Sequence, residues 1–146
     1  MIALCITVAT VLVSDQVVKL LLRHAVGSDA IALGLYGSIQ IVVGRIWFRR
    51  IDRQCSGFLL WSVWVAAATS LVMCCVFTPI NTISVGLILG ASLSHAVETS
   101  VRGSVTDYIC LRRWLAFNFA DLALAAGVLG LTYDLITKVG QHLAWV

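Results

Sequence analysis

Four long apolar stretches constrain this chain more than any other feature of its sequence. They run from Ile2 to Leu22, Phe58 to Phe77, Ile83 to Val101 and Leu115 to Val139. A helix needs roughly 20 residues to cross about 30 Å of hydrocarbon, so each stretch is long enough to span a bilayer. With 60% hydrophobic and 12% charged residues, the chain also lacks the polar surface of a soluble domain. We therefore predict an all-α membrane protein, one domain over residues 1–146 with four transmembrane helices.

A polar segment from Arg23 to Gly57 separates the first two stretches. Within it, the β-branched run SIQIVV favours a short strand between Gly37 and Phe48. The run WFRRIDR, between Ile46 and Arg53, suits either an interfacial helix whose arginines meet lipid headgroups or a solvated basic loop. We expect a small extramembrane segment of β and amphipathic character here.

Six polar residues lie near the ends of three apolar stretches. If successive helices cross the membrane in opposite directions, all six fall in one half of the bilayer: Asp15, Lys19, His95, Glu98, Asn118 and Asp121. Placing an ionisable residue inside a membrane costs roughly 3 kcal/mol, so a convergent set indicates a functional site.

Simpler explanations exist for some of these residues. Asp15 and Lys19 are spaced i, i+4, which allows mutual neutralisation. Glu98 reaches Arg102 at the same spacing. A single HxxE on one helix is a weak metal motif, so no metal or other cofactor is expected. Asp121 has no basic residue within one helical turn, and something outside its helix must stabilise it.

Small residues mark one face on each of the last two stretches. Gly86, Gly90 and Ser94 recur every four residues, and a second set consists of Ala123, Ala126, Gly127 and Gly130. Small residues at this spacing let helix backbones approach closely. We predict that the third and fourth helices pack together and bring Asp107 against Asp121.

The five cysteines show no CxxC pair and no zinc-ligand spacing. Cys5, Cys74 and Cys75 lie inside apolar stretches, where a thiol behaves as a small hydrophobic group. Cys55 and Cys110 lie in the two polar connections, and a disulfide between them is left open.

From Gly90 to Gly127 the chain reads GASLSHAVETSVRGSVTDYICLRRWLAFNFADLALAAG. This segment resembles the signature half of bacterial lipoprotein signal peptidase (signal peptidase II), whose pattern is GNxxDRxxxGxVxDF followed by FNxAD. The last aspartate of each motif matches Asp107, in GSVTDY, and Asp121, in FNFAD. The first stretch adds SDQVVK, similar to the D-Q-x-x-K of that family.

The resemblance implies an intramembrane aspartic endopeptidase that removes signal peptides from diacylglyceryl-modified prolipoproteins without a cofactor. It implies a multi-pass protein of the bacterial cytoplasmic (inner) membrane, with its active site toward the outer surface. Asp107 and Asp121 would be catalytic, with a supporting set of Asp15, Lys19, Asn118, His95, Glu98 and Gly44. Its partners would be prolipoproteins and membrane lipids, with no nucleic acid. Lipid phosphates would meet the arginine cluster of Arg45, Arg49, Arg50 and Arg53.

The chain departs from the family pattern around these motifs. Ser94 and His95 replace Gly-Asn, and Glu98 and Thr99 replace Asp-Arg. The family's Asn-x-Gly-Ala-Ala-Phe element is reduced to VVGRIW, which keeps Gly44 but has Val42 at the Asn position. Two alternatives follow: a catalytically impaired homologue that binds lipidated signal peptides, or a small four-helix membrane transporter or assembly subunit.

The distribution of basic residues opposes the family's topology. Of the ten Lys and Arg residues, nine lie at or near the first and third connections and only Lys138 lies near the other side. The positive-inside tendency would place those connections in the cytoplasm. The family resemblance places the same side, with the active site, at the outer surface.

Overall fold

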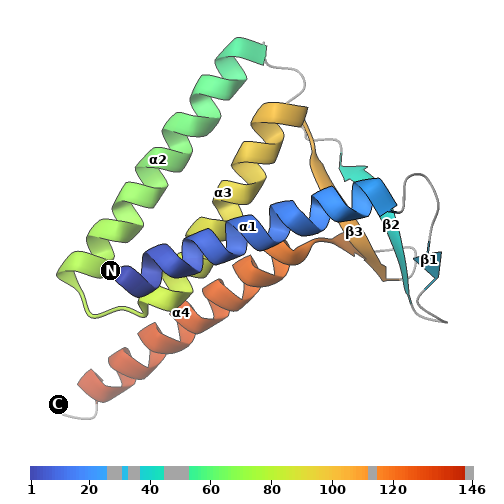
Figure 1. The fold of residues 1–146 in the computed structure, drawn as a ribbon. Coiled ribbons are helices and arrows are strands. Elements are labelled where there is room, and N and C mark those ends of the chain that lie inside the picture. The colour runs from blue at the N-terminus through green and yellow to red at the C-terminus, as the bar shows by residue number, and fades with distance from the viewer. Residues whose placement is uncertain (26–30, 33–36, 45–52, 112–114, 144–146) are drawn as a thin grey trace.

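The structure is a computed structural model that describes residues 1–25, 31–32, 37–44, 53–111 and 115–143. Its helices are α1 (Ile2–Ala25), α2 (Arg53–Phe77), α3 (Thr82–Arg102) and α4 (Phe119–Leu143). Its strands are β1 (Ile31–Ala32), β2 (Gly37–Gly44), β3 (Val105–Leu111) and β4 (Leu115–Phe117). The helices form one body and the strands form a small sheet at the end where α1 and α3 finish (Figure 1).

Three helices are long and apolar enough to cross a membrane, over Ile2–Ala25, Gly57–Phe77 and Phe119–Gln141. The prediction of an all-α membrane protein with four transmembrane helices is therefore confirmed in part: the described residues are mostly helical, with three candidate spans and a small sheet. Among the described residues, α3 is not one of these candidate spans, although it is 21 residues long. It carries more polar residues than the others, including Ser84, Ser94 and Glu98, and all three are buried.

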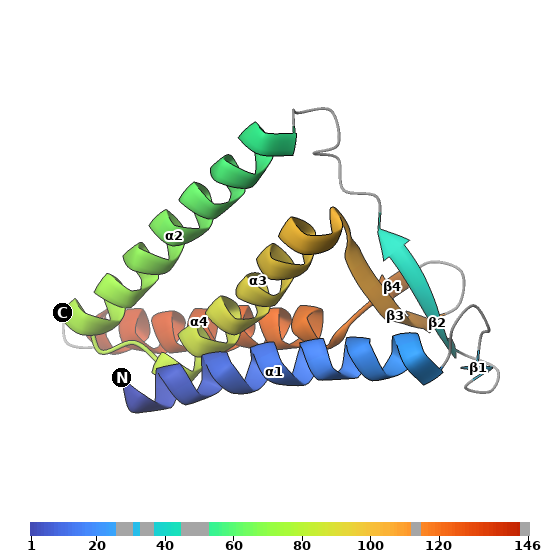
Figure 2. The same ribbon diagram turned by 45° about the horizontal axis from the view of Figure 1, so that its top comes forward.

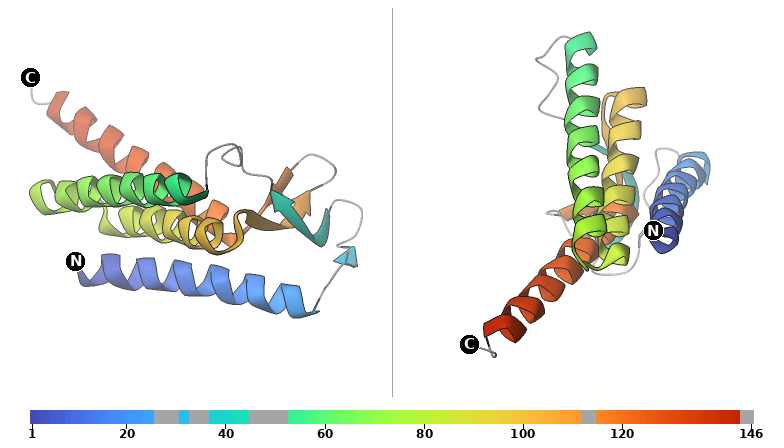
Figure 3. Two further views of the ribbon diagram at one scale, coloured as in Figure 1. Left: turned by 90° about the horizontal axis from the view of Figure 1, so that it is seen from above. Right: turned by 90° about the vertical axis from the view of Figure 1, so that its left-hand side faces the viewer.

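α3 is the central helix, and each of the other three helices packs against it. In both views of Figure 3, α3 lies between α1 and α2. A Cβ built on Gly90 would lie 2.9 Å from the backbone oxygen of Val8, and one on Gly86 would lie 3.1 Å from that of Leu4. The glycines of α3 therefore allow α1 to pack closely against α3. The prediction that these glycines face α4 was wrong.

The contact between α3 and α4 uses glycines of α4 instead. A Cβ on Gly127 would lie 2.7 Å from the backbone oxygen of Ser84, and one on Gly130 would lie 2.5 Å from the Ser84 hydroxyl oxygen. The expected close packing of α3 on α4 is thus confirmed, with the small residues contributed by α4. One glycine pair per interface lets α3 approach both neighbours closely.

The sheet has the strand order β1-β2-β3-β4, and every neighbouring pair is antiparallel. The strand predicted within SIQIVV is present as β2. Ile39 pairs with Ile109 and Val42 pairs with Asp107, so β2 contains one more residue than β3 between these pairs. This is a β-bulge, a feature that frequently lies beside active sites.

Two boundaries differ from the sequence prediction. Asp107 was expected in a connection, but it lies within β3. The fourth helix was expected from Leu115, but residues 115–117 form β4 and the helix begins at Phe119. Both differences arise because β3 and β4 pair as a hairpin. A short apolar run in a sequence does not show whether it forms a strand or the start of a helix.

Both termini lie at the end of the molecule opposite the sheet, together with the turn between α2 and α3 (Figure 2). Asn81 starts α3 there, since its side chain accepts hydrogen bonds from the backbone N–H groups of Ile83 and Ser84. Gly103 ends α3 at the sheet with a φ of 69°, in the left-handed region that glycine adopts without strain. Arg45, Arg49, Arg50 and the side chains of Arg53 and Cys55 lie outside what the structure describes. The interfacial prediction for the arginines and the Cys55–Cys110 disulfide are therefore not tested by the structure.

Candidate active site

The first turn of α4 is closed by a reciprocal pair of side chains. The backbone N–H of Asp121 donates to Asn118 Oδ1 at 3.0 Å, and the backbone N–H of Asn118 donates to Asp121 Oδ2 at 2.9 Å. This is a capping box, which satisfies two backbone donors that a helix start leaves open. It fixes the side chain of Asp121 at the end of α4 that meets the sheet.

Asn118 also connects this helix start to β3. Its Nδ2 donates to Asp107 Oδ1 at 2.8 Å and to the backbone oxygen of Thr106 at 3.3 Å. One fully buried amide therefore binds both predicted catalytic aspartates. Both carboxyl groups are half-buried, and 39% of the Asp121 side chain is exposed, so water and a substrate can reach them.

Burial raises the pKa of Asp107 above its ordinary value, and the nearby charge of Asp121 acts in the same direction. The hydrogen bond from Asn118 opposes these effects without cancelling them. Asp107 therefore keeps a proton to higher pH than an exposed aspartate does.

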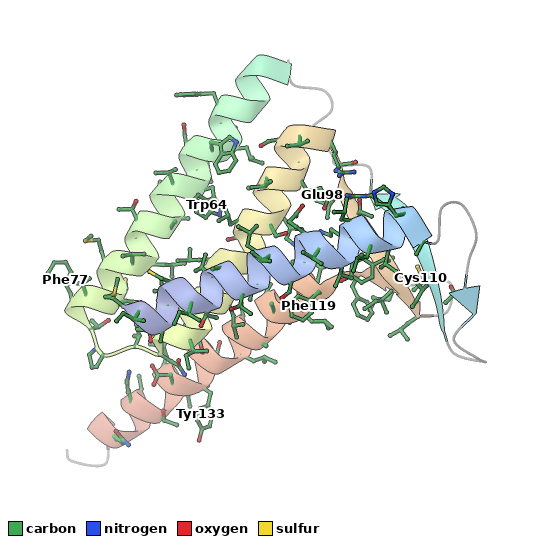
Figure 4. The ribbon with its side chains drawn as sticks, in the orientation of Figure 1. Trp64, Phe77, Glu98, Cys110, Phe119 and Tyr133 are labelled. Carbon is green, nitrogen blue, oxygen red and sulfur yellow. The ribbon has the colours of Figure 1, made fainter. Side chains whose placement is uncertain are left out.

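Two further side chains accept hydrogen bonds from the next backbone N–H groups at the start of α4. The N–H of Ala120 donates to Asp15 Oδ1 at 3.2 Å, and the N–H of Phe119 donates to the Tyr108 hydroxyl oxygen at 2.9 Å. Burial raises the pKa of Tyr108 to about 12, so the phenol stays neutral. Groups from α1, β3 and α4 thus account for the N–H groups of residues 118–121. Figure 4 shows Phe119 at this junction.

Asp15 is joined to α3 as well as to α4. Its Oδ2 accepts from the Ser94 hydroxyl at 2.6 Å and lies 2.7 Å from Lys19 Nζ. Gln16 Nε2 donates to the same Ser94 hydroxyl at 2.8 Å. Asp15, Lys19 and Ser94 are fully buried, so this cluster fixes α1 against α3 directly behind the first turn of α4.

A second buried cluster lies one turn nearer the sheet. Lys19 Nζ donates to Glu98 Oε2 at 2.8 Å, and Arg23 Nη2 donates to Glu98 Oε1. The same Arg23 nitrogen donates to the Thr106 hydroxyl at 2.6 Å, beside Asp107 in β3. Figure 4 shows Glu98 on the last turns of α3, where α1 and β3 meet. The prediction that Glu98 pairs with Arg102 is replaced by pairing with α1, which brings two cations to it.

His95 supplies the outside partner that the sequence predicted for Asp121. Its Nε2 lies 3.1 Å from Asp121 Oδ1, and 22% of the side chain is exposed. Both oxygens of Asp121 therefore have a partner, Oδ1 from α3 and Oδ2 from the helix cap. Within the ranges that the structure describes, no three His, Cys, Asp or Glu side chains gather in a way that could hold a metal ion.

Seven of the eight predicted site residues meet in this region, linked by the contacts above: Asp15, Lys19, His95, Glu98, Asp107, Asn118 and Asp121. Gly44 lies at the end of β2, opposite Val105, and Val42 faces Asp107 directly. Sequence reasoning missed Arg23, Thr106 and Tyr108 as supports. Arg23 follows Lys19 at i+4 and so shares its helix face, which was a usable signal. Thr106 and Tyr108 alternate with Asp107 along β3 and are both buried.

A family model described as signal peptidase (SPase) II matches residues 7–137, which is most of the chain. The chain belongs to the signal peptidase II family. The lipoprotein signal peptidase of Methylobacterium sp. (strain 4-46) is 29% identical over 142 residues, covering 89% of this chain and 86% of that protein. The lipoprotein signal peptidase of Nitrobacter hamburgensis is 31% identical over 84 residues, covering 52% of this chain.

This match covers 46% of the Nitrobacter hamburgensis protein, so the chain spans less than half the length of that relative. Two solved bacterial membrane enzymes share the fold of this signal peptidase II member. One has a TM-score of 0.78 at 15% identity, covering 94% of this chain and 90% of the other. The second has a TM-score of 0.76 at 17% identity, and the match covers 90% of this chain and 91% of the other.

Proposed function

We propose that this protein is an intramembrane aspartic endopeptidase that removes signal peptides from diacylglyceryl-modified prolipoproteins. The observation that carries the proposal is the joint placement of Asp107 and Asp121 by one buried amide, Asn118. These are the two positions that match the catalytic pair of the signal peptidase II family, to which the chain belongs.

The chemistry follows from two carboxyl groups that share a half-buried site. Because both cannot ionise cheaply, the pair holds one proton between them. The ionised member takes a proton from water as the water oxygen attacks the peptide carbonyl. The protonated member polarises that carbonyl, and the leaving amine is then protonated. No step needs a metal or nucleotide.

We further propose that α3 is the fourth membrane span. Its ionisable Glu98 binds Lys19 and Arg23 of α1, and its serines bind Asp15 and Trp64. Polar residues in a membrane helix are tolerated where they face the bundle interior and pair with one another. The bacterial inner membrane, with the sheet and the aspartates toward its outer surface, is the location that the family resemblance supports.

Cleavage of a diacylglyceryl-modified prolipoprotein by the purified protein, followed as a gel shift, tests this function. Asp107→Asn and Asp121→Asn should each lower the rate at least about 1,000-fold, because each removes half of the acid and base pair. Asp134→Asn is the matched control, since Asp134 lies far along α4 and pairs with Lys138 at 2.8 Å. It should keep the wild-type rate within about twofold.

Two results would overturn the proposal. Undiminished cleavage by either dyad variant would remove the aspartic mechanism. Failure of folded wild-type protein to cleave, while it still binds the lipidated substrate, would favour the impaired homologue and direct attention to the departures at Val42, His95, Glu98 and Thr99. Because burial raises the pKa of Asp107, we also expect activity to fall at a higher pH than it would with an acid of ordinary aspartate pKa.

A further inference from the structure

His95 stands where the family pattern has Asn, and its imidazole contacts one of the two proposed catalytic carboxyl groups. Nε2 lies 3.1 Å from Asp121 Oδ1. The other oxygen of Asp121 accepts the backbone N–H of Asn118 at 2.9 Å. Two donors on one carboxylate stabilise its negative charge.

The second ring nitrogen decides which form of His95 fits this position. Nδ1 is buried and has no hydrogen-bond partner among the described residues. A protonated Nδ1 would bury an N–H donor without an acceptor, whereas an unprotonated Nδ1 leaves only an unused lone pair. Of the two neutral tautomers, only the one with its proton on Nε2 can donate to Asp121, and it leaves no buried N–H without an acceptor.

The other charged groups around His95 are already paired. On α1, Asp15 contacts Lys19 at 2.7 Å, and Arg23 binds Glu98 of α3. Lys19 also binds Glu98 at 2.8 Å. These two acids and two bases compensate one another, which leaves Asp107 of β3 and Asp121 of α4 as the dyad. Each has one side-chain donor, Asn118 Nδ2 on Asp107 and His95 Nε2 on Asp121, and Asp121 accepts the backbone N–H of Asn118 in addition.

We propose that His95 is a positioning residue that holds Asp121 as the ionised base of the dyad and so leaves the shared proton on Asp107. This inference rests on the proposed peptidase function. Burial and the charge of Asp121 raise the pKa of Asp107, which is consistent with its role as the acid.

Every proton is accounted for over one catalytic cycle. As the water oxygen forms the new C–O bond, its proton passes to Asp121, and the proton on Asp107 passes to the former carbonyl oxygen. When the C–N bond breaks, Asp121 returns its proton to the amine nitrogen, and one hydroxyl of the intermediate returns a proton to Asp107. His95 Nε2 donates its hydrogen bond throughout and exchanges no proton.

Two substitutions separate this role from a structural one. His95→Gln keeps an N–H donor at a similar reach without a titratable ring, and His95→Leu keeps volume without a donor. We expect His95→Gln to retain kcat within about threefold and to leave the acidic limb of the pH–rate profile in place. His95→Leu should lower kcat about 10- to 100-fold with KM little changed, and should move that limb up by about one pH unit.

Loss of activity in both variants with an unmoved acidic limb would overturn the proposal in favour of a purely structural histidine. Greatly reduced kcat in His95→Gln alone would indicate that the ring itself carries a proton or a charge.

A second measurement needs no substrate. In ¹⁵N-histidine protein, two-bond ¹H–¹⁵N correlations report the tautomer, and the His95→Gln variant assigns the His95 signals. The Nε2–H tautomer is expected, and an Nδ1–H tautomer would overturn the assignment. An inactive wild-type protein with the expected tautomer would contradict the peptidase function while leaving the placement of His95 intact.

Discussion

At the scale of single residues, Asn118 carries the most connections in the site. It caps α4, accepts from Asp121, and donates to Asp107 and to the backbone of β3. Its burial makes each of these bonds costly to lose, because water cannot replace the missing partner. The same side chain therefore supports both the stability of the helix start and the spacing of the dyad.

Asn118→Ala is expected to destabilise the protein by about 1–2 kcal/mol through loss of the cap, and to lower the rate of cleavage about 100-fold. Asn81→Ala is the matched control, because Asn81 caps α3 in the same way at the opposite end. It should cost somewhat less stability, because Asn81 is exposed and water can replace its hydrogen bonds, and it should leave the rate within about twofold. Thermal unfolding in detergent and the gel-shift assay measure the two effects. Equal activity losses in both variants would contradict a specific role for Asn118.

The pH dependence of Asn118→Ala has a definite sign. The hydrogen bond from Asn118 lowers the pKa of Asp107, so its removal raises that pKa further. Because the proposed acid must be protonated, the alkaline limb of the remaining activity should move to higher pH. A limb that moves to lower pH would contradict Asp107 as the acid.

At the scale of helices and strands, the site depends on how closely α1 approaches α3. Asp15, Lys19 and Arg23 lie on α1, and their partners Ser94 and Glu98 lie on α3. The short side chains of Asp15 and Ser94 can meet only when the two backbones are close, and Gly86 and Gly90 allow that approach. The hydrogen bond from Arg23 to Thr106 then connects this helix pair to β3 of the sheet.

Gly90→Ala should therefore weaken the site from a distance. Its new Cβ would lie 2.9 Å from both the backbone oxygen of Val8 and the Cβ of Val11, so α1 must move away. We expect a loss of about 1–3 kcal/mol in stability, with a drop in cleavage rate. Gly140→Ala, where a Cβ meets nothing within 4 Å, is the control and should be neutral or slightly stabilising. Unchanged activity in Gly90→Ala would show that the α1 contacts do not align the dyad.

At the scale of the whole molecule, the fold places every site residue at one end. The sheet, the end of α3 and the start of α4 meet there, while both termini and the turn at Pro79 lie at the other end (Figure 2). α2 contacts α3 among the helices, and its candidate span has no buried residue. The exposed, apolar surface of α2 is suited to contact lipid, while the polar clusters described above involve the other three helices.

Reporter fusions decide which side of the membrane holds the site. With the dyad at the outer surface, a fluorescent protein fused after Val146 should fluoresce in the cytoplasm, and alkaline phosphatase fused after Gly103 should be active outside. The reverse pattern would follow the nine Lys and Arg residues near the first and third connections and would place the dyad in the cytoplasm. Swapping the two reporters between the sites controls for expression.

The sequence by itself determined the membrane class and the approximate helices, and it supplied the prediction that Asp107 and Asp121 form a catalytic dyad. These depend on local information: apolar length, spacing along one helix, and two motifs that contain Asp107 and Asp121. The Asn118-x-x-Asp121 capping box was also readable, and it would have moved the predicted start of α4 from Leu115 to Phe119.

Only the tertiary structure decided which groups neutralise one another. Glu98 pairs with α1 across 75 or more residues of sequence rather than with its own helix, and His95 reaches Asp121 on another helix. Spacing along a chain orders the contacts within one helix, but it does not specify which face meets a neighbour. That choice follows from close backbone approach at Gly86, Gly90, Gly127 and Gly130, and from the pairing of β3 with β2 and β4.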